Sequence, residues 1–220
     1  MNQSFQPTSY KDIVFPSVQV TQLLDDLVTN QIPFPSHGRN GVICYGPNGT
    51  GKSTLVSLLP DAMEMVRTGQ PACTPTRHVV ASGNNGASLM ASLANIAANV
   101  SFNFGHQFFI LDEVDNLGAA SMQSLKSIMD TPRSIFLMTT NHLAAIDRGV
   151  KSRSHLIDMT QPPPAAWLPR CRSILSALGA SRIPSDAELL PLIVACSGDA
   201  REIVTQMHQL ARMLRQSGAP

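Results

Sequence analysis

Residues 46–54 have the types and the spacing of a loop that binds phosphate groups. They fit the pattern G-x-x-x-x-G-K-[ST], in which glycines let the backbone approach phosphates without an intervening Cβ. Lys52 is expected to reach the β- and γ-phosphates of a nucleotide, and the Ser53 hydroxyl to bind Mg²⁺. The predicted ATP-binding residues are Gly46, Pro47, Asn48, Gly49, Thr50, Gly51, Lys52, Ser53 and Thr54.

The segments on both sides of this loop also fit that role. An apolar, strand-like segment precedes it at residues 41–45, and residues 54–59 can begin a helix. A loop between a strand and a helix points several backbone N–H groups at one spot, beside the positive end of the helix dipole. A chance glycine-rich turn is the alternative, and the complete motif with both flanks disfavours it.

Two acidic residues follow a second apolar segment. Asp112 and Glu113 come directly after residues 108–111, and the carboxyl end of a parallel strand faces the crevice in which such sheets bind ligands. We expect Asp112 to hold Mg²⁺ through its water shell and Glu113 to act as the general base on the attacking water. An exposed acidic turn is the alternative reading.

Three further polar residues are candidates for the same chemistry. Asn141 follows the apolar run 134–140, and it can reach the γ-phosphate or the lytic water if that strand lies between the loop strand and the Asp112 strand. Arg153 is a candidate arginine finger for a neighbouring subunit's γ-phosphate, and Arg201 for folding over the bound phosphate. A turn asparagine and two solvated arginines are the alternatives.

The order of elements predicts an α/β fold. Strand candidates lie at residues 41–45, 78–81, 107–111, 134–140 and 155–159, and helix candidates at 18–28, after the loop, at 89–100 and at 121–130. Continuous apolar strands that alternate with helices indicate a five-stranded parallel sheet covered on both faces. After a triple proline the pattern changes to three helices, near 165–178, 185–196 and 199–215. We therefore expect a core over residues 1–161 and a small helical domain over 162–220.

Composition limits the possible classes of protein. The 220 residues are 43% hydrophobic, which permits a proper core, and the net charge of +1 gives no global electrostatic case for nucleic acid. The four cysteines show neither a zinc spacing nor a disulfide framework. Because no apolar run approaches the ~18 residues of a membrane helix, we expect a soluble, cytoplasmic protein with no membrane partner.

Together these motifs resemble the AAA+ ATPases. The resemblance rests on the phosphate loop, on Asp112-Glu113-Val114-Asp115, on Thr140-Asn141, on Ser152-Arg153-Ser154 and on Gly198-Asp199-Ala200-Arg201. Within that family, the stretch from Gln123 to Asp130 is similar to the Q-x-L-R-x-x-M-E stretch of the small ATPase subunits of sliding-clamp loaders. Phe5-Gln6-Pro7 likewise resembles the family's Y-R-P start, near which residues border the adenine.

The sequence departs from the clamp-loader pattern at several points. Gln6 and Lys126 stand where the family has arginine, and Ser154 stands where it has cysteine. The family's subunits continue with a helical collar, whereas this sequence ends at Pro220. We therefore expect either a truncated chain or assembly without a collar.

The resemblance implies an oligomeric, Mg²⁺-dependent ATPase that acts in DNA replication. Its partners would be other AAA+ subunits, DNA and a sliding clamp. The alternatives are an AAA+ helicase loader or a plasmid or phage replication factor, an ATP-gated scaffold that does not hydrolyse ATP, and a P-loop kinase. Glu113 argues against the scaffold, and Asn141, Arg153 and Arg201 together argue against the kinase.

Overall fold

A computed structural model describes residues 5–80, 86–98 and 105–217, and within them five strands form one parallel sheet. The strands are β1 (Gly41–Tyr45), β2 (Thr76–Val79), β3 (Gln107–Asp112), β4 (Ser134–Thr140) and β5 (Ser154–Asp158). Their order in the sheet is β2-β3-β4-β1-β5, with parallel pairing at every junction. The predicted parallel five-stranded sheet is therefore confirmed, and β4 lies between β1 and β3 as expected.

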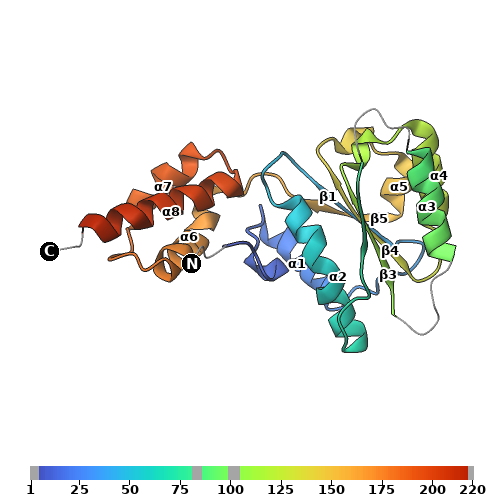
Figure 1. Ribbon diagram of the computed structural model, residues 1–220, viewed down its shortest axis with the longest axis horizontal. Helices are drawn as coiled ribbons and strands as arrows, with labels where there is room; N and C mark the ends of the chain where they lie inside the picture. The colour runs from blue at the N-terminus through green and yellow to red at the C-terminus, as the bar shows by residue number, and fades with distance from the viewer. Residues whose placement is uncertain (1–4, 81–85, 99–104, 218–220) are drawn as a thin grey trace.

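Eight α-helices accompany the sheet in the described part of the chain. They are α1 (Val18–Val28), α2 (Lys52–Thr68), α3 (Ala87–Ala98), α4 (Ala119–Ile128), α5 (Arg148–Ser152), α6 (Leu168–Ala177), α7 (Asp186–Ala195) and α8 (Ala200–Ser217). Short 3-10 turns occur at Tyr10–Asp12, Val114–Asn116, Leu143–Ala145 and Pro164–Trp167. Figure 1 shows α6, α7 and α8 grouped at one end of an elongated molecule and the sheet toward the other end.

Both faces of the sheet carry apolar side chains, and helices cover both faces. In β1, Val42 and Cys44 face one hydrophobic cluster and Ile43 faces the other, and none of the three is exposed to solvent. One cluster contains residues of α1 and α2, and the other contains residues of α3, α4 and α5. Figure 1 shows these helices on opposite sides of the strands. This arrangement explains why β1, β3 and β4 read as continuous apolar runs.

The three C-terminal helices pack around a third hydrophobic cluster. In α8 the buried residues are Ile203, Met207, Ala211 and Leu214, whose spacing matches one face of a helix. The first three of these side chains meet buried residues of α6 and α7. Phe5, from the start of the chain, also packs against this cluster, so the N-terminal segment contacts the C-terminal helices.

Most predicted elements shift by one to three residues at their ends. The strand predicted at 78–81 is β2, and its last predicted residue lies outside the described residues, as do the last two of the helix predicted at 89–100. The sequence Gly83-Asn84-Asn85-Gly86 predicts a turn, and this segment also lies outside the described residues, except for Gly86. Helix α5 was not predicted because its five residues are too few to show a helical period.

Candidate functional site

The phosphate loop runs from the end of β1 to the start of α2. Its glycines at 46, 49 and 51 all have positive φ, with values of 151°, 81° and 91°. A Cβ at Gly46 would collide with the backbone of Met159, so the loop needs glycine there for space as well as conformation. The N–H of Gly46 donates to the carbonyl oxygen of Thr140 at 3.3 Å, which ties the loop to the end of β4.

Lys52 is held inside the curve of this loop. Its Nζ donates to the carbonyl oxygens of Gly46 at 2.8 Å and Pro47 at 2.6 Å, and the residue is only 8% exposed. Burial lowers the pKa of its ammonium group. The loop backbone therefore fixes the lysine at the N-terminal end of α2, where a helix favours an anion.

Asp112 and Glu113 end β3 and are both bonded to Thr139 of the neighbouring strand. The Thr139 hydroxyl donates to Asp112 Oδ1 at 3.1 Å, and it accepts from the N–H of Glu113 at 3.0 Å. Asp112 is 3% exposed, whereas the Glu113 side chain is exposed, because a left-handed backbone (φ 59°) turns Glu113 away from the strand direction. The two acids thus differ in environment: one is buried and bonded, and the other reaches the cavity described next.

A cavity of about 590 Å³ lies at the carboxyl ends of these strands. The residues of the phosphate loop from Asn48 to Thr54 line it, together with Glu113, Asn141 and Arg201. Its size falls within the usual range of small-molecule sites, roughly 300–1,000 Å³. Asn141 follows β4, as expected, and its Oδ1 is buried with no hydrogen-bond partner among the described residues.

Apolar and aromatic side chains also line this cavity. It is lined by Phe5, Ile13, Val14, Trp167, Val204 and His208, which come from the N-terminal segment and from the C-terminal helices. Phe5 and His208 meet edge to face, with ring centroids 5.1 Å apart. Arg170 of α6 bonds the carbonyl oxygen of Phe5 at 3.3 Å. The cavity lining thus combines the residues of the phosphate loop with aromatic and apolar side chains that suit a flat ring.

The C-terminal helices touch the phosphate loop directly. The N–H of Ala200 donates to the carbonyl oxygen of Gly49 at 3.0 Å. The Asp199 carboxylate accepts from the N–H of Arg201 at 2.8 Å and of Glu202 at 3.3 Å, so it caps the start of α8. This cap brings Arg201 to the cavity.

Arg153 is the one predicted site residue found at the opposite end of β1. Its carbonyl oxygen accepts from the N–H groups of Asn40 and Gly41 at 3.1 and 3.0 Å, where β1 begins. The phosphate loop starts where β1 ends, five residues later, which is about 16 Å at ~3.3 Å per residue. The guanidinium is bonded to Asp130 through Nε at 2.8 Å and Nη2 at 3.1 Å. The hydrogen bond to Asp130 raises the pKa of Arg153.

Asp112 does not line the cavity either, and its carboxylate is bonded to two neighbouring side chains. Besides Thr139, its partner is Arg77 of β2, whose Nε and Nη2 lie 2.9 and 2.7 Å from Oδ2. Sequence reasoning missed Arg77, Thr139 and Trp167. Thr139 left a signal, since two threonines end an otherwise apolar strand, whereas nothing local marks Arg77 as a partner of Asp112.

The oxygen ligands present fit magnesium by their chemistry. Mg²⁺ is bound in proteins by one or two oxygen side chains together with waters and substrate phosphates. The Ser53 hydroxyl lines the cavity, and Asp112 supplies a carboxylate. A carboxylate accepts about four hydrogen bonds, and Asp112 accepts three from Arg77 and Thr139, which leaves one for a metal-bound water. Among the described residues, His, Cys, Asp and Glu form no group of three or more that could hold a metal ion.

This phosphate loop, acidic strand end and parallel sheet define a P-loop nucleotide-binding protein of the αβα class. More specifically, residues 42–161 match the model of the ATPase family associated with various cellular activities (AAA), and the chain belongs to this family of AAA+ ATPases. No curated protein sequence matches the chain. Within the described residues, no helix combines the length and apolarity needed to cross a membrane.

Solved structures with a similar fold include two variants of RuvB from Thermotoga maritima. An arginine-to-alanine variant superposes with a TM-score of 0.69 at 15% identity, covering 99% of this chain and 68% of that chain. A threonine-to-valine variant superposes with a TM-score of 0.68 at 17% identity, covering 97% of this chain and 67% of that chain. At this identity the likeness concerns the fold, and it includes the helices after the sheet.

Proposed function

We propose that this chain binds ATP with Mg²⁺ in the 590 Å³ cavity and hydrolyses the ATP as one subunit of an oligomer. Lys52 and Arg201 stabilise the phosphates, Glu113 accepts a proton from the attacking water, and Asn141 senses the γ-phosphate. Ser53 directly and Asp112 through a water would hold Mg²⁺, which would supply positive charge to the phosphates. The apolar side chains around Trp167 in the cavity hold the adenine base of the ATP.

The position of Arg153 supports a shared active site. Its backbone is anchored at the start of β1, and the phosphate loop begins about 16 Å away at the other end of that strand. The arginine therefore cannot reach the γ-phosphate of its own subunit. A cation in that position suits an arginine finger that enters the neighbour's site, where such a group contributes about 10³–10⁵ in rate.

We further propose that residues 162–220 form a lid on a core formed by residues 1–161. The lid helices enclose their own hydrophobic cluster, and one backbone hydrogen bond joins Ala200 to Gly49 of the phosphate loop. Since Arg201 and Trp167 reach the cavity from the lid side, a bound nucleotide touches both parts. Loss of the γ-phosphate would then change how the lid sits on the core.

The work coupled to hydrolysis is, in our proposal, the loading of a sliding clamp on DNA during replication. The support is the resemblance over residues 123–130, whose last residue, Asp130, is the partner of Arg153. The fold is similar to that of RuvB from Thermotoga maritima. That likeness does not distinguish clamp loading from other roles. A helicase loader or another replication factor would use the same active site with a different partner.

A mixing experiment tests the shared site. Lys52→Ala should abolish ATP hydrolysis by failing to hold phosphate, and Arg153→Ala should abolish it by failing to complete the neighbour's site. In a mixture, some interfaces pair an intact loop with an intact arginine, so activity should return to about a quarter of the wild-type rate if subunits exchange at random. Glu113→Gln mixed with Lys52→Ala is the matched control, since both defects lie in the same site and no interface is repaired. No recovery in the first mixture would refute the shared site.

Two more measurements separate the possible partners. Primer–template DNA should stimulate hydrolysis, and the stimulation should fall with rising salt because phosphate contacts release counterions. A sliding clamp added with that DNA should stimulate it further. Stimulation by DNA without any response to clamps would favour the helicase-loader or replication-factor reading, and no response to either would exclude the DNA role.

A further inference from the structure

The edge strand of the sheet supplies a cation to Asp112. Arg77 of β2 donates from Nε and Nη2 to Asp112 Oδ2 at 2.9 and 2.7 Å. The Asp112 side chain is 4% exposed, whereas the Arg77 side chain is 42% exposed, so the arginine reaches a buried carboxylate from the open edge. A charge-assisted fork of this kind fixes a carboxylate in orientation as well as compensating its charge.

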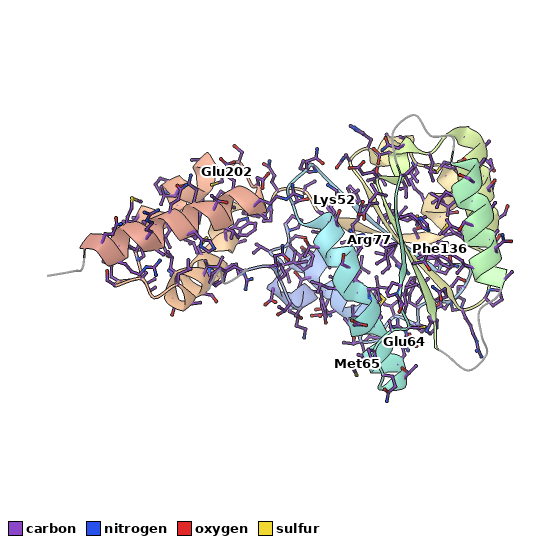
Figure 2. All side chains as sticks on the ribbon, in the orientation of Figure 1. Lys52, Glu64, Met65, Arg77, Phe136 and Glu202 are labelled. Carbon is purple, nitrogen blue, oxygen red and sulfur yellow. The ribbon has the colours of Figure 1, made fainter. Side chains whose placement is uncertain are left out.

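The same guanidinium is also tied to the helix that follows the phosphate loop. Nη1 of Arg77 donates to Ser57 Oγ at 2.5 Å, and Ser57 Oγ in turn donates to the carbonyl oxygen of Ser53 at 2.6 Å. Figure 2 shows Arg77 beside α2, between that helix and the strands. One side chain thus connects the two residues that we assign to Mg²⁺, one by an ion pair and the other through Ser57.

The charge of Arg77 has a consequence for nucleotide binding. A buried carboxylate close to a triphosphate repels the nucleotide and attracts the metal ion, and both effects are strong where water is excluded. The guanidinium opposes both effects, because its positive charge lies against Asp112 Oδ2. Without the guanidinium, the protein would bind nucleotide more weakly in the absence of Mg²⁺. Adding Mg²⁺ would then increase the nucleotide affinity by a larger factor.

We propose that Arg77 is a positioning residue which neutralises and orients Asp112, and thereby limits how strongly ATP binding depends on Mg²⁺. This inference rests on the proposed function, since it concerns the same nucleotide site. Arg77 itself does not line the cavity, and it acts through Asp112 and through Ser57. It compensates the charge of the Asp112 carboxylate and orients that carboxylate for the water shell of the metal.

The test compares the affinity for a non-hydrolysable ATP analogue in excess Mg²⁺ with the affinity in EDTA. For Arg77→Gln we expect the ratio of the two dissociation constants to rise about ten-fold, mostly through weaker binding in EDTA. Arg77→Lys keeps the charge and should stay within about three-fold of the wild type. Arg172→Gln is the matched control, because it removes one arginine from an exposed ion pair between α6 and α7, with Asp186, and Arg172 does not line the cavity. Its ratio should not change.

Each outcome has a definite meaning. An unchanged ratio in Arg77→Gln, with a normal melting curve, would overturn the inference and leave Arg77 a structural residue of the sheet edge. A ratio in Arg77→Lys that matches Arg77→Gln would overturn the charge argument. Arg77→Met serves if Arg77→Gln does not fold, because it removes the same charge and keeps an unbranched stem. Failure of the proposed function is distinct, since the wild type would then bind no analogue under either condition.

Discussion

Arg153 and Asp130 form a two-point ion pair on the surface, with Arg153 Nε 2.8 Å from Oδ1 and Nη2 3.1 Å from Oδ2. The pair joins the residue after α5 to the end of the 123–130 segment. Both side chains have solvent access, with exposed fractions of 28% and 57%. The contact therefore orients a cation at the molecular surface without burying it, which is consistent with the role toward a neighbouring subunit that we propose for Arg153.

The first prediction concerns how much the Arg153–Asp130 ion pair contributes to stability and to ATP hydrolysis. Asp130→Asn should change the free energy of unfolding by no more than about 1 kcal/mol, because exposed ion pairs contribute little. Hydrolysis by the assembled protein should stay within about three-fold of the wild-type rate, because the N–H groups of Asn40 and Gly41 still donate to the Arg153 carbonyl oxygen and anchor its backbone. Arg153→Ala should lose at least about a hundred-fold in turnover. Equal losses in both variants would show that Asp130 is itself required for the arginine to act.

The second prediction separates binding from chemistry at Glu113. Glu113→Gln keeps the shape of the side chain and its contact with Asn116, whose Nδ2 lies 3.3 Å from Oε2. Nucleotide affinity should be unchanged, while turnover should fall about 10²–10⁴-fold because the amide cannot accept the proton. Equilibrium binding and steady-state phosphate release measure the two quantities. Unchanged turnover would remove Glu113 as the base.

The third prediction concerns the contact between the phosphate loop and α8. A Cβ at Gly49, where φ is 81°, would collide with the Asp199 carboxylate, so Gly49→Ala should weaken nucleotide binding at least ten-fold. Gly69→Ala is the matched control: it has a similar positive φ of 72°, and its added Cβ meets nothing within 4 Å. Both variants should lose about 1–2 kcal/mol of stability from the left-handed backbone. Equal nucleotide binding in both would show that the Gly49–Asp199 contact is unimportant.

The fourth prediction is a pH dependence in the C-terminal helices. Hydrogen bonds from Arg182 and then Ser185 lower the pKa of Glu188 from its ordinary 4.5 to about 2. Because the folded pKa lies below the unfolded one, this contribution to stability is present above about pH 4.5 and is lost as the pH falls toward about 2. Glu188→Gln should therefore melt at a lower temperature at pH 7, with a smaller decline on acidification. Thermal melts from pH 7 to pH 2 measure both.

Glu202→Gln is the control for that series. Glu202 lies in the first turn of α8, like Glu188 in α7, and its carboxylate has no hydrogen-bond partner among the described residues. Figure 2 shows it on the helical end of the molecule. If both glutamines flatten the pH curve equally, the bonds at Glu188 are not the cause.

Much of the fold and half of the site could be predicted because the signals are contiguous. The phosphate loop is nine residues in a row, Asp112 and Glu113 stand at the end of an apolar strand, and apolar runs mark β1, β3 and β4. Helix α5 was not predicted, because a five-residue segment that contains a glycine is too short to show the periodicity of a helix. The domain boundary at 161/162 and the roles of the site residues remain predictions, since geometry alone does not measure a role.

The sequence by itself therefore determined a nucleotide-binding αβα fold, because local patterns dictate a strand, a glycine loop and a helix in that order. Only the tertiary structure decided which strands are neighbours in the sheet and which distant side chains therefore meet. The strand order puts β2 beside β3, so that Arg77 meets Asp112 from 35 positions away. The same order anchors Arg153 at the start of β1 and leaves the phosphate loop at its end. Such pairings depend on strand neighbours and register, which no stretch of sequence carries locally.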